Sequence, residues 1–219
     1  MVDFSGLDAK EAVRLQNELR LRVVMNNAFE KVDTVAGVDV GIKEGMATAA
    51  VVVISYPALE VIEYAISVRP VEFPYVPGLL AFREIPAIID AFEKLKHTPD
   101  MLMVDGQGYA HPRRFGLACH LGVELDLPSI GCGKTRLIGD YREPARAKGS
   151  TEPLMDKREV VGRIVRTKDG VKPLFVSIGH RIDLDTAVKL VIGCVKRRRL
   201  PEPISIAHDV AGGNSAKRP

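Results

Sequence analysis

Val35-Ala-Gly-Val-Asp-Val-Gly41 has the alternating, β-branched character of a strand. Two further strands are predicted directly after it, at Met46–Tyr56 and Leu59–Arg69, and the short breaks between the three contain Gly or Pro. Such breaks leave no room for the crossover that parallel neighbours need. The sequence therefore predicts an antiparallel three-stranded meander.

The rest of the chain alternates helical and strand patterns. A capping box at Asp8-Ala-Lys-Glu11 predicts a helix to about Phe29. Another helix is predicted from about residue 79 to Lys96, and Pro86 either kinks it or marks its start. The later predicted elements are buried strands at Met101–Val104 and Pro128–Cys132 with a helix over Arg113–Asp126 between them, a surface loop over residues 140–153, hairpin strands at Glu159–Thr167 and Pro173–Ile178, and a last helix over Asp183–Arg199.

A meander followed by strand–helix–strand units predicts an α/β fold, with a mixed sheet flanked by helices. The 219 residues suit one domain, residues 1–219, and a composition of 46% hydrophobic and 27% charged residues argues against disorder. The longest apolar run, Met46–Ile54, is too short to span a bilayer, and the acidic N-terminus does not resemble a secretory signal. Three cysteines without metal-ligand spacing predict a cytoplasmic protein with reduced thiols.

Charge is unevenly distributed along the chain. Residues 1–109 carry 10 Lys+Arg against 16 Asp+Glu, a net charge of −6, whereas residues 110–219 carry 21 against 12, a net charge of +9. This asymmetry is consistent with an acidic site in one half and an anion-binding surface in the other. Lys196-Arg-Arg-Arg199 ends the predicted last helix, where cations suit the helix dipole, so we interpret it as a solvated face.

Three carboxylates are the first candidates for chemistry. Asp39 lies on the first predicted strand, on the same face as Gly37 and Gly41, which leave space for a metal or a nucleic-acid backbone to approach. Asp105 follows a buried strand, where ligand sites of α/β sheets form, and Glu84 begins a helix. Taken alone, each of these acids could have a purely structural role. Together they predict a Mg²⁺ or Mn²⁺ site of the kind that phosphodiester hydrolysis requires.

Two basic positions follow strands in the same region. Lys134, in Gly131-Cys-Gly-Lys134, is placed to reach a phosphate, although Pro128 breaks the phosphate-loop pattern and excludes a nucleotide phosphotransferase of that type. His111, in His111-Pro-Arg-Arg114, is the better functional candidate among the histidines near Asp105.

An unusual loop precedes Glu84. In Pro74-Tyr-Val-Pro-Gly78, Pro74 and Pro77 brace an aromatic and a β-branched residue. Tyr75 either packs into the core or serves as a rigid wedge that enters a base stack.

These motifs, in this order and spacing, resemble the endonuclease V family over nearly the whole chain. The segments that carry the resemblance are Gly37-Val-Asp39, Pro74–Gly78, Phe82-Arg-Glu84, Val104-Asp-Gly-Gln-Gly108, His111–Gly116, Gly131–Lys134, Pro153-Leu-Met-Asp156, Gly179-His-Arg181 and Arg199-Leu-Pro-Glu-Pro203. The resemblance implies a ribonuclease H-like fold. It also implies a metal-dependent nick in DNA containing deaminated bases, chiefly deoxyinosine, at the second phosphodiester bond 3′ to the lesion, leaving 3′-hydroxyl and 5′-phosphate ends.

The resemblance also implies roles for individual residues. Asp39, Glu84 and Asp105 would bind Mg²⁺, with Mn²⁺ as a substitute, and Lys134 would lie near the scissile phosphate. His111 is assigned to the catalytic group. The implied substrate-binding residues are the wedge Tyr75 with Pro74 and Pro77, the pocket glycines Gly78, Gly108 and Gly131, and His208.

The sequence departs from the family at Gln107, where the family usually has His. Glutamine hydrogen-bonds but does not titrate near neutral pH, so an acid–base role at this position is not expected here. We expect a monomer that acts on DNA, and the sequence leaves open whether inosine-containing RNA is a further or the main substrate. The alternatives are a resolvase or ribonuclease of the same fold, which the Tyr75 loop disfavours, and a non-catalytic binder of inosine-containing RNA, which the three acids disfavour.

Overall fold

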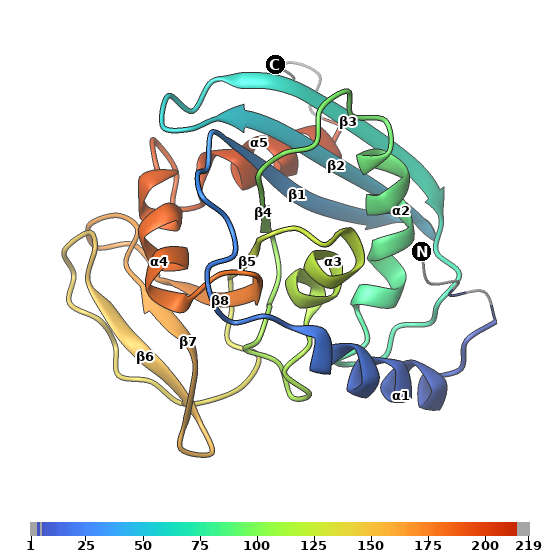
Figure 1. The fold of residues 1–219 in the computed structure, drawn as a ribbon, viewed down its shortest axis with the longest axis horizontal. Coiled ribbons are helices and arrows are strands. Elements are labelled where there is room, and N and C mark those ends of the chain that lie inside the picture. Colours follow the sequence, from blue (N-terminus) through green and yellow to red (C-terminus); the bar gives the residue numbers. More distant parts are fainter. Residues whose placement is uncertain (1–3, 5, 214–219) are drawn as a thin grey trace.

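A computed structural model describes residue 4 and residues 6–213 of the chain. Its centre is one eight-stranded sheet with the order β3-β2-β1-β4-β5-β8-β7-β6 (Figure 1). The strands are β1 (Thr34–Lys43), β2 (Met46–Ser55), β3 (Val61–Pro70), β4 (Met101–Val104), β5 (Ser129–Gly133), β6 (Thr151–Asp156), β7 (Glu159–Val165) and β8 (Leu174–His180).

The pairing confirms the predicted meander and the mixed sheet. β1 pairs antiparallel with β2, and β2 with β3, whereas β4 lies parallel to β1 and β5 parallel to β4. On the far side of β5 the sheet is antiparallel again through β8, β7 and β6. β4 therefore ends beside the middle of β1, and β5 runs alongside β4 in the same direction.

Helices cover both faces of this sheet (Figure 1). They are α1 (Ala9–Leu19), α2 (Ala81–Phe92), α3 (Leu117–Leu125), α4 (Leu184–Gly193) and α5 (Glu202–Ala211). Residues from α2 and α3 pack with Val51 and Val104 on one face, and residues from α4 and α5 pack with Val52 and Ile178 on the other. Burial on both faces explains why β2 and β4 are apolar almost throughout.

Two predicted helices end earlier than expected. The capping box at Asp8 is present, but α1 ends at Leu19 instead of near Phe29. After a single 3-10 turn, the chain is held away from the helical path by two backbone hydrogen bonds, from the N–H of Arg181 to the carbonyl of Val24 and from the N–H of Ala28 to the carbonyl of Arg181. α2 begins at Ala81 and ends at Phe92. Pro86 therefore lies inside α2 instead of marking its start.

Two elements were absent from the sequence prediction. β6 begins at Thr151 and replaces the last residues of the predicted 140–153 loop, and Pro153 is tolerated there because β6 is the edge strand of the sheet. The predicted helix over Asp183–Arg199 ends at Gly193, and a separate helix, α5, follows after a turn. Pro203 lies in the first turn of α5, where its missing N–H costs no hydrogen bond.

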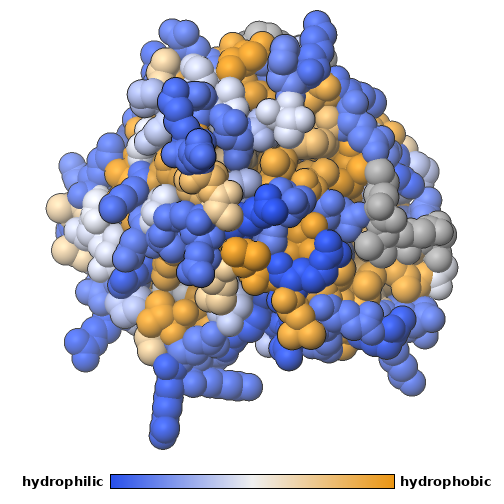
Figure 2. Space-filling model, in the orientation of Figure 1, coloured by the Kyte–Doolittle hydropathy of each residue, from blue (hydrophilic) through white to orange (hydrophobic). Residues whose placement is uncertain are grey.

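The visible surface mixes hydrophilic side chains with small apolar patches (Figure 2). Within residues 4 and 6–213, none of the helices combines the length and apolar character that crossing a membrane requires.

Candidate active site

Two of the predicted acids meet because β1 and β4 are parallel neighbours. Val38 pairs with Val104, and the N–H of Asp105 donates to the carbonyl of Val38 over 2.9 Å. Asp39 and Asp105 each follow one member of this pair, so their side chains lie beside each other. Their exposures are low, 11% for Asp39 and 9% for Asp105.

His208 reaches the same place from α5. Its Nδ1 atom lies 2.8 Å from Oδ2 of Asp39. One ligand atom from each of Asp39, Asp105 and His208 falls within 4.8 Å of the others, a group that could hold a metal ion. The sequence prediction placed His208 among the substrate-binding residues, whereas the structure places it in the acidic cluster.

Helix α5 also overturns the interpretation of the glycines beside Asp39. A Cβ atom on Gly37 would lie 2.1 Å from the carbonyl carbon of Pro203, and one on Gly41 would lie 3.8 Å from the carbonyl oxygen of Ala211. The space over Gly37 is therefore occupied by α5 and is not open to a ligand. Gly37 is required so that α5 can approach the strand and deliver His208.

Glu84 lies in the first turn of α2 and is 8% exposed. Burial is the main cause that raises its pKa to about 8, and the charges of Asp39 and Asp105 add to the shift. Burial likewise raises the pKa of Asp105 to about 6, while the neighbouring Lys134 opposes the rise. These shifts mean that the ionised forms of the clustered acids are disfavoured, and a bound cation would restore them by offsetting their repulsion.

Two basic side chains lie at the edge of the acidic cluster. The ammonium of Lys134, at the end of β5, forms an ion pair with Asp105. The guanidinium of Arg199 lies 3.4 Å from the carbonyl oxygen of Lys134, and burial lowers its pKa while Asp105 raises it. The sequence prediction missed Arg199, because a run of four basic residues gives no sign of which one turns inward.

A pocket of about 170 Å³ adjoins the cluster. Its walls come from the Tyr75–Gly78 loop, the start of α2, the segment after β4 and the start of α3. Gly106 and Gln107, the two residues after Asp105, belong to the wall. One short loop therefore joins the acidic cluster to an adjacent pocket that is lined mostly by apolar and backbone groups.

A model of the endonuclease V family matches residues 17–209 of this chain. The chain is 50% identical over 201 residues to an endonuclease V of Roseiflexus sp. (strain RS-1), covering 92% of this chain and 90% of that protein. The chain belongs to the endonuclease V family.

Solved structures agree with this assignment. The endonuclease V of Streptomyces avermitilis superposes with a TM-score of 0.90 at 42% identity, covering 96% of this chain and 94% of that one. The Ciona intestinalis endonuclease V, solved in complex with a 24mer DNA containing an inosine followed by a ribo-adenosine, gives a TM-score of 0.82 at 30% identity, covering 95% and 98%. The predicted ribonuclease H-like α/β fold is confirmed, and the chain is a nuclease.

His111 lies in the pocket wall of this endonuclease V and not in the acidic cluster. Its Nε2 atom is 3.1 Å from the carbonyl oxygen of Gly78, which also accepts hydrogen bonds from Arg113 (2.6 Å) and Gln16 (3.1 Å). Burial lowers the pKa of His111 to about 4, so the ring is neutral at physiological pH. The geometry gives His111 a positioning role for the Gly78 loop.

Of the three predicted pocket glycines, Gly78 lies in the pocket wall, but Gly108 and Gly131 lie behind it. A Cβ on Gly108 would meet the carbonyl oxygen of Ile178 at 2.0 Å, and one on Gly131 would meet the nitrogen of Gly108 at 2.4 Å. These two glycines allow β5, β8 and the loop after β4 to pack closely. Gln107 is fixed by a 2.9 Å hydrogen bond from its Nε2 atom to the carbonyl oxygen of Thr135.

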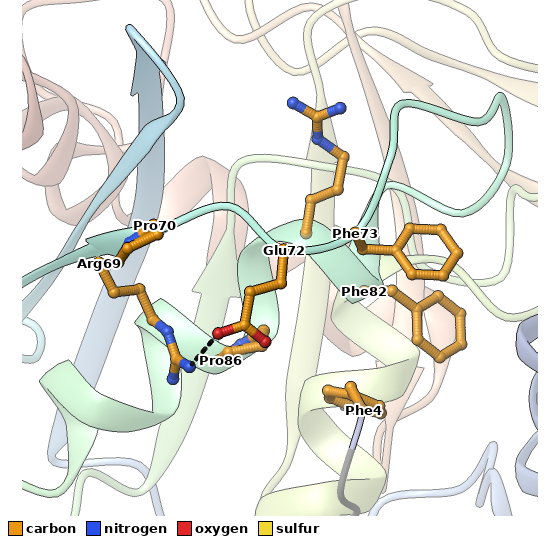
Figure 3. Close-up of a pocket in the computed structure, with 8 residues that line it drawn as sticks. Phe4, Arg69, Pro70, Glu72, Phe73, Phe82 and Pro86 are labelled. Carbon is orange, nitrogen blue, oxygen red and sulfur yellow. Dashed lines mark ion pairs between the residues drawn. The ribbon is translucent and has the colours of Figure 1, made fainter. Parts of the chain in front are cut away.

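Tyr75 is 71% exposed, so it does not pack into the core. The guanidinium carbon of Arg83 lies 5.6 Å from the centre of its ring. Pro77 lines the pocket, whereas Pro74 is exposed outside it. The base of the loop is anchored by Phe73, which lies against Phe82, as Figure 3 shows. Tyr75 is thus an outward-facing ring on an anchored loop.

Proposed function

We propose that this chain is a repair endonuclease that nicks DNA containing deoxyinosine, or another deaminated base, at the second phosphodiester bond 3′ to the lesion. The observation that carries the proposal is the continuity between cluster and pocket, because Asp105 belongs to one and Gly106 and Gln107 to the other. A base held in the pocket would keep a nearby phosphate of the same strand beside the acids. The inosine in the DNA bound to the Ciona relative supports the choice of lesion.

Asp39, Asp105 and His208 would hold a divalent cation, and Glu84 would place a third carboxylate near it. Mainly carboxylate donors with one imidazole suit Mg²⁺, with Mn²⁺ as a substitute. The bound cation would supply Lewis-acid activation of water and neutralise charge on the phosphate. Lys134, and Arg199 next to it, would offset the charge that grows on the scissile phosphate.

The test is cleavage of matched single-stranded DNA and RNA, each with one inosine, together with an inosine-containing duplex and undamaged controls. With Mg²⁺, we expect inosine-dependent nicks that map to the second bond on the 3′ side and leave 3′-hydroxyl and 5′-phosphate ends. The RNA arm measures whether inosine-containing RNA is also a substrate. Binding without any cleavage would instead support the non-catalytic binder, and lesion-independent cleavage would support a general ribonuclease or resolvase.

Cation binding is expected to release protons. At pH 7 Glu84, with a pKa of about 8, is mostly protonated, while Asp105, with a pKa of about 6, is mostly ionised. Affinity for Mn²⁺ should therefore rise between pH 6 and pH 8 and level off above, with up to about one proton released at pH 7. Calorimetry in buffers of different ionisation enthalpy measures this release.

The stability of the metal-free protein should change with pH in the opposite direction to its metal affinity. A carboxyl group with the ordinary value of 4.5 ionises before the folded Glu84 does, so the folded state binds more protons between about pH 4.5 and pH 8. The free energy of unfolding contributed by Glu84 falls as pH rises through this window. Glu84→Gln should abolish both this fall and most of the proton release. Equal proton release from the variant would remove Glu84 from the site.

Tyr75→Ala is expected to weaken recognition of inosine in duplex DNA by about 1–3 kcal/mol, since the ring would no longer fill the gap left by an extruded base. The loss should be smaller on single strands, where less unstacking is needed. Binding is measured without divalent cations, and Tyr75→Phe, which keeps the ring, serves as the matched control. Unchanged duplex binding by Tyr75→Ala would exclude the wedge role.

We also propose that residues 1–219 work as one domain and as a monomer in the cytoplasm. The continuous sheet supports a single domain, and the acids, Lys134 and the pocket all come from one chain. The free thiols of Cys119, Cys132 and Cys194 are consistent with a reducing compartment. Sedimentation equilibrium tests the monomer.

A further inference from the structure

The hairpin between β6 and β7 turns through only two residues, Lys157 and Arg158, between the paired residues Asp156 and Glu159. Both have left-handed backbones, with φ of 50° and 70°. Two-residue hairpin turns of this kind normally use Asn and Gly, which adopt positive φ with least strain. Two long basic side chains thus occupy positions where they are conformationally unfavourable, which points to a role outside the fold.

The charges of this turn are free to act on a ligand. Lys157 and Arg158 are both exposed, and neither has an ion pair among the described residues. The flanking acids offset these charges only in part, because the guanidinium of Arg114 pairs with both of them, at 2.6 Å from Asp156 and 2.9 Å from Glu159. Three basic side chains (Arg114, Lys157 and Arg158) against two carboxylates leave the tip of the hairpin with a net positive charge, carried by its two exposed turn residues.

The tip is also held in place relative to the candidate active site. Tyr109 donates a 2.6 Å hydrogen bond to Glu159, and Arg114 bonds through its guanidinium to the carbonyl oxygen of His111 over 3.1 Å. Tyr109 and Arg114 belong to the same loop that carries Asp105 and the pocket wall. Figure 1 shows the turn projecting from the body of the molecule beside this loop, and hydrophilic side chains extend from the same place in Figure 2.

We propose that Lys157 and Arg158 bind the phosphate backbone of the nucleic-acid substrate beyond the nucleotide held in the pocket. This inference rests on the proposed function, since a strand that enters the pocket must continue across the neighbouring surface. A nucleic acid presents a regular row of phosphates, and two adjacent cations on a fixed arm match such a row without reading bases. The contact would set the path of the strand through the site and not the choice of lesion.

The test is the double variant Lys157→Asn/Arg158→Gly, which removes both charges and supplies the residues that the turn prefers. Binding to long inosine-containing and undamaged duplexes is measured without divalent cations at several salt concentrations. We expect the slope of log K against log[salt] to become shallower by about 1–2, with the same loss of affinity on both duplexes. The melting temperature should stay the same or rise, which separates lost binding from lost folding.

The matched control is Lys31→Asn/Lys96→Asn. It removes the same net charge near the starts of β1 and β4, at the opposite end of these strands from Asp105. We expect it to leave the salt dependence unchanged. An unchanged slope in the tip variant, or an equal change in both variants, would overturn the proposal. If the parent protein fails to nick inosine-containing DNA, the proposed function fails, but the effect of the tip on undamaged DNA remains measurable.

Discussion

Asp105→Asn is expected to lower the single-turnover rate of inosine-directed nicking by roughly 10³-fold or more in Mg²⁺. The amide keeps the shape of the side chain but removes the charge that would hold the cation between Asp39 and His208. Asp39→Asn should act in the same way, because it removes the carboxylate on the other side of the same group.

The fold should survive both changes. Burial and neighbouring acids already disfavour the ionised form of Asp105, so a neutral amide relieves repulsion within the cluster. Lys134 loses its partner but is 36% exposed, so water can solvate its ammonium. The melting temperature without metal should therefore be unchanged or higher at neutral pH.

The matched control is Asp90→Asn on α2, which removes a partly exposed ion pair with Arg69 far along the helix from Glu84. It should keep nearly full activity and lose under about 1 kcal/mol of stability. Rates are measured with enzyme in excess, alongside Mn²⁺ titrations. Near-normal nicking by Asp105→Asn at ordinary Mg²⁺ would exclude this residue from the metal site.

Local signals explain what the sequence could predict. The meander, the capping box at Asp8 and the buried strand before Asp105 all depend on neighbours within a few residues. Parallel pairing of β1 and β4 then follows from the alternation of strand and helix. Because both acids follow matched positions on these strands, their convergence is a consequence of the same pattern.

The missed features depend on contacts between distant parts of the chain. α5 is short and begins at prolines, so its local pattern is weak, and its place is set by the close approach of Pro203 to Gly37. Because α5 was not predicted, the face above Gly37 was expected to be open, and nothing fixed the position of His208. The place of His111 in the pocket wall could not be read locally for a similar reason, since its partner, the carbonyl of Gly78, lies 33 residues away.

Gly37→Ala tests this long-range packing directly. The added methyl group would lie 2.1 Å from the backbone of Pro203 and 2.6 Å from the nitrogen of Ile204, and backbone atoms cannot rotate away as a side chain can. Overpacking of this kind costs about 1–3 kcal/mol and sometimes more, which for a chain of this size lowers the melting temperature by roughly 3–10 °C. Part of the strain should be relieved by displacement of α5, which carries His208.

Nicking by Gly37→Ala should therefore fall even well below its melting temperature, together with the affinity for Mn²⁺. Gly41→Ala is the matched control, because it lies on the same face of β1, also two residues from Asp39, yet its methyl group would make only an ordinary 3.8 Å contact with Ala211. We expect it to keep stability, Mn²⁺ affinity and nicking close to the parent values. If the two alanine variants behave alike in all three measurements, α5 does not hold His208 in the site through Gly37, and the histidine must be positioned by other contacts.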